Sequence, residues 1–464
     1  MNSVSMVSPE MTNLHIKTRI IDDLLGGTLS MRAAGKTYLF QMPLEDNETY
    51  KNRLGRTTLY PALKETLSQM CGRVFYSPIN ISSVNDRIVS DIFPDVDSNG
   101  NNLDVFASQW FYSALAYGVS FVLVDYTKID GAQTKADEKA LGARPYLIHI
   151  KPQDVLGIKY ERRNGKMAIT QFRYREFVEE DNGDFLTKKI EQINVCEPGK
   201  VTKYRLNQVH GGKGEFGEFE SADVKVNGRP LTFIPVVPFI TKKTSHFALG
   251  EPPLMELANL NVKHWQSQSD QDNLLNIARV PLLVRIGVTD DSVVRIGGSV
   301  VDLPSGASLA YVEHTGTAIE AGQKSINELE AQMRVAGAKL LEKADMAMTD
   351  SQARDERDKE ISLLRLYANR FEDALDQALE YVGLWLGIDA EDVGNVEISG
   401  NIDSNLDPNA SMDSVIKLQT AGVISKQTTF EEAKRRGLIS DNVNWEEEQA
   451  RTDGEGLNND NFSE

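Results

Sequence analysis

The sequence is poor in the residues on which catalysis, metal binding and covalent cross-linking depend. Only two of its 464 residues are cysteines, Cys71 and Cys196, which excludes a disulfide framework and favours a reducing, intracellular setting. The six histidines lie far apart, and none has a cysteine or an acid at the spacing of a metal site. No credible phosphate loop, zinc-protease motif or nucleophile elbow occurs. We therefore expect no catalytic residue, no cofactor and no metal, and a protein that is not an enzyme.

Long hydrophobic runs and an excess of positive charge are missing as well. No run approaches 18 apolar residues, so no transmembrane helix is expected, and the first residues lack the apolar region of a secretory signal. The formal net charge is −18, which argues against a protein that binds nucleic acid tightly through clustered lysines and arginines. An acidic surface would still let nucleic acid pass, because repulsion of phosphate prevents tight binding. Taken alone, the charge favours the simpler explanation that it keeps the protein soluble.

Two short stretches match ligand-binding motifs only in part. Residues 95–100 (DVDSNG) resemble the first half of a calcium loop, but Phe106 stands where the bidentate glutamate should be. Residues 212–217 (GKGEFG) match a dinucleotide fingerprint by letter, yet the sequence after them is β-rich and acidic. We expect a hairpin loop at the second stretch and a polar loop at the first. The polar loop would cap the next helix through one of three side chains: Asn101, Asn102 or Asp104.

The first 250 residues mix helical and strand patterns, which predicts an α+β fold. Helices are expected at 16–25, 60–75 and 103–116, and the second has one apolar face made of Leu63, Leu67, Met70 and Val74. A nearly continuous apolar run at 119–126 predicts a strand buried on both faces. Further strands are expected in an antiparallel sheet, at 145–150, 168–176, 186–195 and 201–209. Residues 230–240 are apolar but broken by proline, which indicates an edge strand or a linker.

Residues 252–386 organise the chain, because they hold three long helical patterns. Two of these, 254–279 and 319–344, are each 26 residues long, or about 39 Å. Strand patterns between them lie at 282–286, 299–303 and 308–312. We interpret the stretch as an antiparallel helix pair with a small β module at its tip. The module is too small for a core of its own, so a neighbouring chain is expected to complete it.

Polar residues are distributed unevenly along these helices. Residues 266–273 (QSQSDQDN) include no apolar side chain, so this part should face water or pack polar-to-polar against copies of itself. The second helix has a narrow apolar seam, formed by Ile326, Leu329, Met333, Ala336, Leu340 and Ala344. A break at 342–352 precedes the third helix, 351–386, which is apolar on one face only from Ile361 onward.

The C-terminal part is predicted to hold two small helices, at 411–420 and 428–436. Thr428 and Glu431 have the spacing of a capping box at the start of the second helix. From Asp441 onward the tail is strongly acidic, and we expect its end to be disordered.

Four long stretches together resemble the portal proteins of tailed bacteriophages. The densest similarity is PPLMELANLNVKHWQSQSDQDNLLNIARVPLLVRIG at 252–287. Residues 37–67 resemble the N-terminal part of that family, 111–126 its helix-to-strand wing element, and 421–437 its C-terminal helical segment. These are patterns of whole elements, without a catalytic signature, and together they span roughly residues 35–450.

The resemblance implies a portal-like α+β fold with separate parts. In chain order these are an α+β wing (1–250), a first stem helix (251–280), a β-containing clip (281–318), a second stem helix (319–344), a tunnel loop (345–352), a long wing helix (353–387) and a crown-like helical region with the acidic tail (388–464).

The resemblance further implies a ring of about twelve copies at one capsid vertex. Double-stranded DNA would pass through its channel during packaging and ejection. The large subunit of a separate terminase, the major capsid protein and a head–tail adaptor would dock on the ring. The chain would lie in the virion, and in the host cytoplasm during assembly, without contacting a membrane.

Three groups of residues acquire roles from the same resemblance. The tunnel loop facing DNA would be Asp345, Met346, Ala347, Met348, Thr349 and Asp350. Lys339 and Lys343 would be channel lysines. The stem contacts between copies would be Gln266, Gln268, Asp270, Asp272 and Met333.

Two alternatives stay open at this point. One is a structural scaffold with long helices that conducts no DNA. The other is a hydrolase that uses unpaired carboxylates or a divalent metal, although no spacing singles out a pair of acids.

Overall fold

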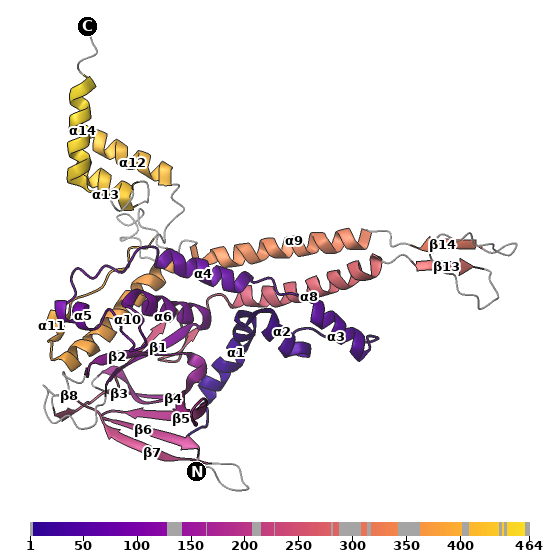
Figure 1. Cartoon of the computed structure of the whole chain (residues 1–464), viewed down its shortest axis with the longest axis horizontal. Coiled ribbons are helices and arrows are strands. Elements are labelled where there is room, and N and C mark those ends of the chain that lie inside the picture. Colours follow the sequence, from indigo (N-terminus) through magenta and orange to yellow (C-terminus); the bar gives the residue numbers. More distant parts are fainter. Residues whose placement is uncertain are drawn as a thin grey trace.

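The computed structural model describes residues 3–127, 142–163, 165–206, 215–226, 228–279, 282–286, 308–312, 317–341, 362–400, 408–435, 439 and 443–459. The chain has an α+β fold with three visible parts: a body of two sheets and several helices, a long helical arm, and a group of C-terminal helices (Figure 1).

A three-stranded antiparallel sheet forms the centre of the body. Its order is β10–β1–β2, with β10 at Val236–Ile240, β1 at Val119–Tyr126 and β2 at Pro145–Ile150. Val122 and Val124 of β1 pack into the helical core, whereas Phe121 and Leu123 pack toward a second sheet. The continuous apolar run of β1 is thus explained, because both of its faces are buried. As an edge strand, β10 tolerates Pro238, as expected.

Helices cover one face of this sheet. Helices α6 (Leu103–Tyr117) and α10 (Leu363–Leu386) contact the sheet, and α4 (Ala62–Val74) packs against both of them. Helix α1 (Pro9–Leu25) joins this layer through Ile21 and Leu24, whereas its Met11 and Leu14 pack with residues of the second sheet. The short α5 (Asp86–Asp91) and α11 (Ala390–Val393) lie at the periphery. An aromatic cluster joins α6 and α10 to β10. Phe371 lies 5.0 Å from Trp110 and 4.9 Å from Phe239, between ring centroids. The predicted apolar faces of α4 and α10 are buried in this core.

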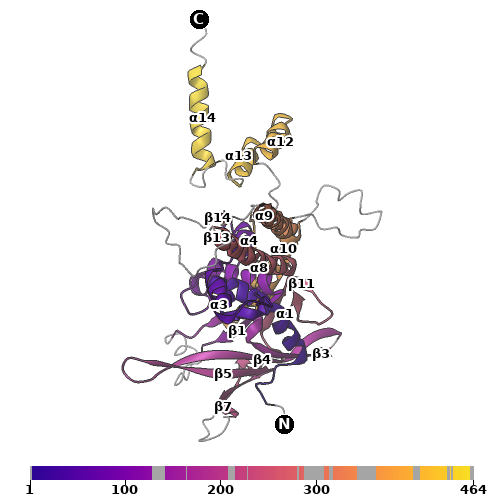
Figure 2. The same ribbon diagram turned by 90° about the vertical axis from the view of Figure 1, so that its right-hand side faces the viewer.

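The second sheet covers the other face of the central sheet. It is an antiparallel meander of β3 (Val155–Arg163), β4 (Lys166–Asp181), β5 (Thr187–Glu197), β6 (Lys200–Leu206) and β7 (Phe216–Asp223). Val155, Phe172 and Cys196 are buried against β1. Figure 2 shows this sheet on one side of the helical layer and the C-terminal helices on the opposite side. Two small strand pairs, β8 (Lys225–Val226) with β9 (Arg229–Pro230) and β11 (Lys242–Lys243) with β12 (Gly250–Glu251), complete the body.

The arm consists of two helices and a hairpin. Helix α8 (Met255–Ala278) runs beside α9 (Thr317–Ala338), which ends in the 3-10 turn η3 (Lys339–Leu341). The strands β13 (Leu282–Ile286) and β14 (Ser308–Val312) pair antiparallel at the far end of the arm (Figure 1). The predicted helix pair with a β module at its tip is confirmed, while the strand expected at 299–303 lies outside the described residues.

Several predicted element boundaries are wrong. Helix α10 begins at Leu363 and not at residue 351. Ser362 is extended and acts as the N-cap, since its side chain accepts a hydrogen bond from the backbone N–H of Arg365. Residues 351–361 lie outside the described part. Strand β3 was not predicted, since its outer half is exposed and polar. The other helices of the N-terminal part are α2 (Gly27–Ala34) and α3 (Asn47–Arg56), with the 3-10 turns η1 (Gly35–Thr37) and η2 (Pro152–Asp154).

The C-terminal helices are α12 (Pro408–Thr420), α13 (Lys426–Arg435) and α14 (Trp445–Asn459). The capping residue of α13 is Ser425, whose Oγ accepts from Thr428 N at 3.0 Å, so the capping box predicted at Thr428 is wrong. The acidic tail is helical through Asn459. Three glutamates in the first turn of α14 complement the helix dipole beside the Asn444 cap, which explains why an acidic segment forms a helix. Among the described residues, no helix is long and apolar enough to cross a membrane.

Candidate functional site

The arm is the candidate functional element, and its base is fixed to the body by a buried amide. Asn261 of α8 is 1% exposed. Its Oδ1 accepts from Leu63 N at 3.1 Å, and its Nδ2 donates to Tyr60 O at 2.8 Å. Leu63 lies in the first turn of α4, where N–H groups have no acceptor within the helix, and Tyr60 lies just before that helix. Asn261 therefore satisfies the first turn of α4 and sets the angle at which α8 leaves the body.

The polar segment of α8 packs against the N-terminal part of the same chain. Gln266 Nε2 donates to Tyr38 O at 2.7 Å, and Ser269 Oγ accepts from Thr57 Oγ1 at 2.9 Å. Ser269 is 1% exposed and Gln271 5% exposed. The expectation that residues 266–273 must face water or copies of themselves is therefore wrong for Gln266, Ser269 and Gln271. A polar helix face is buried here because another polar surface of the chain satisfies it.

A buried ion pair holds that N-terminal surface together. The side chain of Arg53 is 2% exposed and that of Glu45 is 5% exposed. The guanidinium donates to both carboxylate oxygens at 2.8 Å, a bidentate geometry, and its Nη1 also lies 3.4 Å from Asp270 Oδ1 on α8. Hydrogen bonds from Arg53 hold the pKa of Glu45 below its usual value. Loss of one partner would leave the other charge buried and unpaired, which costs about 3–5 kcal/mol.

Sequence reasoning missed Arg53 and Glu45. Tyr50, Arg53 and Thr57 recur at helical spacing and are all buried, but only Tyr50 is apolar, so the sequence pattern does not mark this face as buried. A cation on an otherwise inward-facing stripe requires an acidic partner nearby.

A second amide locks the two arm helices to each other. Gln271 Nε2 donates to Ile319 O at 2.9 Å, a carbonyl in the first turn of α9. A Cβ on Gly322 would lie 2.1 Å from Gln271 Oε1. The absence of a side chain at residue 322 therefore makes room for the glutamine between the helices. The apolar seam of α9 is confirmed through Leu340, since Ile326, Leu329, Met333, Ala336 and Leu340 are all buried.

The predicted stem contacts fall into different environments. Asp270 is exposed, and Gln268 donates to Asp272 Oδ1 at 2.8 Å within the helix. Met333 is 2% exposed and lies in the core of its own chain, so its side chain is covered without a second copy. Lys339 Nζ lies 2.7 Å from Glu256 Oε2 at the base of the arm, where both side chains are largely exposed. Lys343 and residues 345–350 lie outside the described part of the chain.

The predicted calcium-like loop is closed by its own side chains. Asp97 accepts from Asn99 N at 3.0 Å and from Asn101 Nδ2 at 2.7 Å, and Asp95 pairs with Arg144 at 2.6 Å. Asn102 is the N-cap of α6, accepting from Val105 N at 3.0 Å, which confirms one of the three predicted caps. In the described ranges, no three histidine, cysteine or acidic side chains lie close enough together to hold a metal ion.

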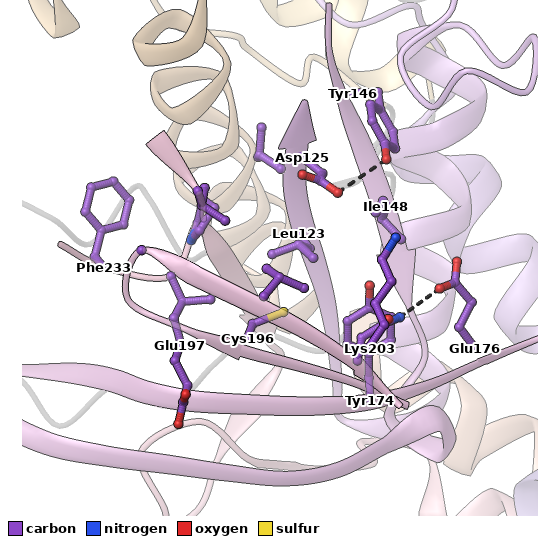
Figure 3. A pocket seen from close by; sticks show the side chains of 17 residues that line it. Leu123, Asp125, Tyr146, Ile148, Tyr174, Glu176, Cys196, Glu197, Lys203 and Phe233 are labelled. Atoms are coloured by element: carbon purple, nitrogen blue, oxygen red, sulfur yellow. Dashed lines mark hydrogen bonds between the residues drawn. The ribbon is translucent and has the colours of Figure 1, made fainter. Parts of the chain in front are cut away.

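A cavity of about 110 Å³ between the two sheets is lined by two acids whose surroundings bear on the hydrolase alternative, Asp125 and Glu176 (Figure 3). Burial raises the pKa of Asp125, which accepts from Tyr146 Oη at 3.3 Å and from Tyr126 N at 2.8 Å. Glu176 accepts from Asn194 Nδ2 at 2.7 Å on the neighbouring strand. Both carboxyl groups are thus engaged by neighbouring donors. The cavity can accommodate a few waters around a carboxyl group that takes up a proton more readily than usual.

In comparisons with known proteins, residues 253–386 match a family described as a domain of unknown function (DUF4055). The match coincides with the arm and α10, and assigns them no activity. No curated protein matches the chain.

The solved structures similar to the chain include chains of gene transfer agent (GTA) particles. A chain of the virion of a native GTA particle is 10% identical, with a TM-score of 0.42, over 88% of this chain and 98% of that chain. A chain from the neck of the native particle, computed with C12 symmetry, is 12% identical with a TM-score of 0.39, over 82% of this chain and 90% of that chain. A chain from the neck of the empty particle, computed with C6 symmetry, gives the same values.

Proposed function

We propose that this chain is the subunit of a portal ring, a passive channel through which double-stranded DNA enters and leaves a phage-type capsid. The observation that carries the proposal is the arm. Two 24- and 22-residue helices, about 36 and 33 Å long, project from the body and end in a two-stranded hairpin. Two strands are described at this tip, and a pair of strands by itself is at best marginally stable in water, so neighbouring copies are the natural source of further packing.

The chemistry of the chain agrees with a passive role. The arm helices are joined by a hydrogen bond from Gln271, and α8 is supported by the buried Glu45–Arg53 ion pair of the N-terminal part. These contacts stiffen the arm without creating a reactive centre. A net charge of −18 disfavours tight binding of DNA that has to slide. In this proposal the chain is not an enzyme, and the work of packaging is done by a terminase whose large subunit docks on the ring. The major capsid protein and a head–tail adaptor would be its other partners, with the ring in the virion.

Blocking the proposed channel tests conduction. Met348→Cys, labelled with a bulky maleimide, should leave assembly intact and stop DNA packaging, because residues 345–350 are proposed to line the tunnel. The native cysteines will compete little for the label: burial raises the pKa of Cys71 to about 12, and Cys196 is 1% exposed.

The matched control is Phe185→Cys with the same label, since Phe185 is 95% exposed at the turn between β4 and β5. This variant should package normally. Normal packaging by the labelled Met348→Cys ring as well would refute the tunnel assignment and favour the scaffold that conducts no DNA.

A further inference from the structure

The loop between η1 and α3 presents three large apolar side chains to solvent. Phe40 is 68% exposed, Met42 42% and Leu44 101%. We call residues 40–44 the apolar knob. Exposed apolar side chains are common one at a time, but three in five residues on one loop mark a surface made for contact.

Hydrogen bonds to Arg53 and Glu45 hold the backbone of the knob in place. Arg53 Nη2 donates to Phe40 O at 2.6 Å, and Met42 N donates to Glu45 Oε2 at 3.0 Å. Gln41 Nε2 donates to Glu45 O at 2.7 Å, which closes the turn. The same buried ion pair that supports α8 therefore fixes the backbone of the knob. A loop that is already ordered loses little conformational entropy when its outer side chains are buried by a partner.

An apolar groove of matching character lies elsewhere on the body. Its open volume is about 690 Å³, between α4, α6 and the end of β2, and its walls include Leu25, Phe75, Tyr112 and Tyr117. Small residues line it as well, namely Ser68, Gly72 and Ser108, and they leave room for side chains of another molecule.

We infer that the apolar knob of one copy docks into this groove on the next copy, an inference that rests on the ring proposed above. Charge favours the pairing. Asp46 and Glu48 adjoin the knob, and exposed Lys151 lies at the groove. The knob and the groove share no residue, so the contact is heterologous, the type that closes into a ring when the rotation between copies closes.

Photo-crosslinking of the full-length chain tests the inference. Leu44 is replaced by p-benzoylphenylalanine, and the assembled protein is irradiated and digested. We expect covalent dimers in which residue 44 is joined to a peptide containing residues 68–75 or 108–117. The same probe at Phe185, which is 95% exposed, should give no product with those peptides.

A second variant, Leu44→Asp, should raise the protein concentration needed for ring formation at least about tenfold. Its melting temperature below that concentration should not change, because Leu44 makes no buried contact in its own chain. Rings that form with crosslinks mapping elsewhere, or a Leu44→Asp variant that assembles like the wild type, would overturn the docking and leave the ring proposal standing. A wild-type chain that stays monomeric would overturn both.

Discussion

At the scale of single residues, buried polar side chains determine how the arm helices meet the body and each other. Asn261, Gln271 and Arg53 each replace apolar packing with directed hydrogen bonds, and each connects segments far apart in the sequence. Such groups fix one geometry because any other arrangement would leave them buried without partners. The apolar positions Leu63, Leu67, Met70 and Val74 were predictable from helical spacing. The partners of Arg53 were not, since an ion pair between a loop and a helix leaves no periodic signal.

The Glu45–Arg53 pair makes the stability of the chain depend on acid pH. The folded-state pKa of Glu45 lies below its ordinary value of 4.5, chiefly because Arg53 hydrogen-bonds the carboxylate. A carboxyl group whose pKa is lowered by folding stabilises the folded state. This stabilisation is complete at pH values above the unfolded-state pKa and is lost as the pH falls through the folded-state pKa. This can be measured by urea denaturation between pH 7 and pH 3, at a protein concentration below that of assembly. The wild type should be more stable than Glu45→Gln at pH 7, and the difference in the free energy of unfolding should shrink below about pH 4.5.

Glu48→Gln is the matched control for this measurement, because Glu48 is also close to Glu45 in the chain, lies on α3 with Arg53, and is exposed. Its difference from wild type should stay small at every pH. A stability gap between wild type and Glu45→Gln that is the same at pH 7 and pH 3 would contradict the assigned ion pair.

At the scale of elements, the packing of α8 on α9 depends on the space above Gly322. Replacing glycine by alanine inside a helix normally stabilises it by about 0.5–1 kcal/mol. Here the new methyl group would displace Gln271 and break its bond to Ile319 O, so Gly322→Ala should lower the free energy of unfolding by about 1 kcal/mol. In a Gln271→Ala background, the same change should raise it by about 0.5 kcal/mol, a reversal of sign that urea denaturation of the four proteins can resolve.

Gly55→Ala provides the control for the ordinary helical effect, because a Cβ at Gly55 in α3 would meet no atom within 4 Å. That variant should be as stable as wild type or more so. If Gly322→Ala changes stability in the same direction in both backgrounds, Gln271 is not the neighbour that requires the glycine.

Most elements could be predicted from the sequence, and the errors have physical causes. The strands β1, β2, β13 and β14 have the predicted bounds. Glycine or proline marks both ends of the apolar runs of β2 and β13, and the start of those of β1 and β14. Helix α10 was predicted too long, since the charged run before Ile361 has good helical composition but Ser362 caps the helix. Helix α14 was missed because composition suggested a disordered tail, whereas acidic side chains favour a helix start.

At the scale of the whole molecule, the arm and the α+β body could be predicted, but the surface against which α8 packs could not. A polar helix face can be covered by water, by another copy or by a distant segment of the same chain, and the sequence pattern is the same in all three cases. The structure shows the third case for Gln266, Ser269 and Gln271, and leaves Asp270 exposed. The part of the arm that remains uncovered, with its tip hairpin, is the part for which an assembly partner is proposed.

The measurement that tests the account most directly is native mass spectrometry of the purified full-length chain, with negative-stain images of the same sample. We predict closed rings of about twelve subunits with a central hole, because the arms and their hairpins need neighbours and their contacts are proposed to be heterologous. The mass should be a multiple of 51.6 kDa. A homogeneous monomer or dimer across micromolar concentrations and several salt conditions would contradict the portal proposal and direct attention to the acids around Asp125.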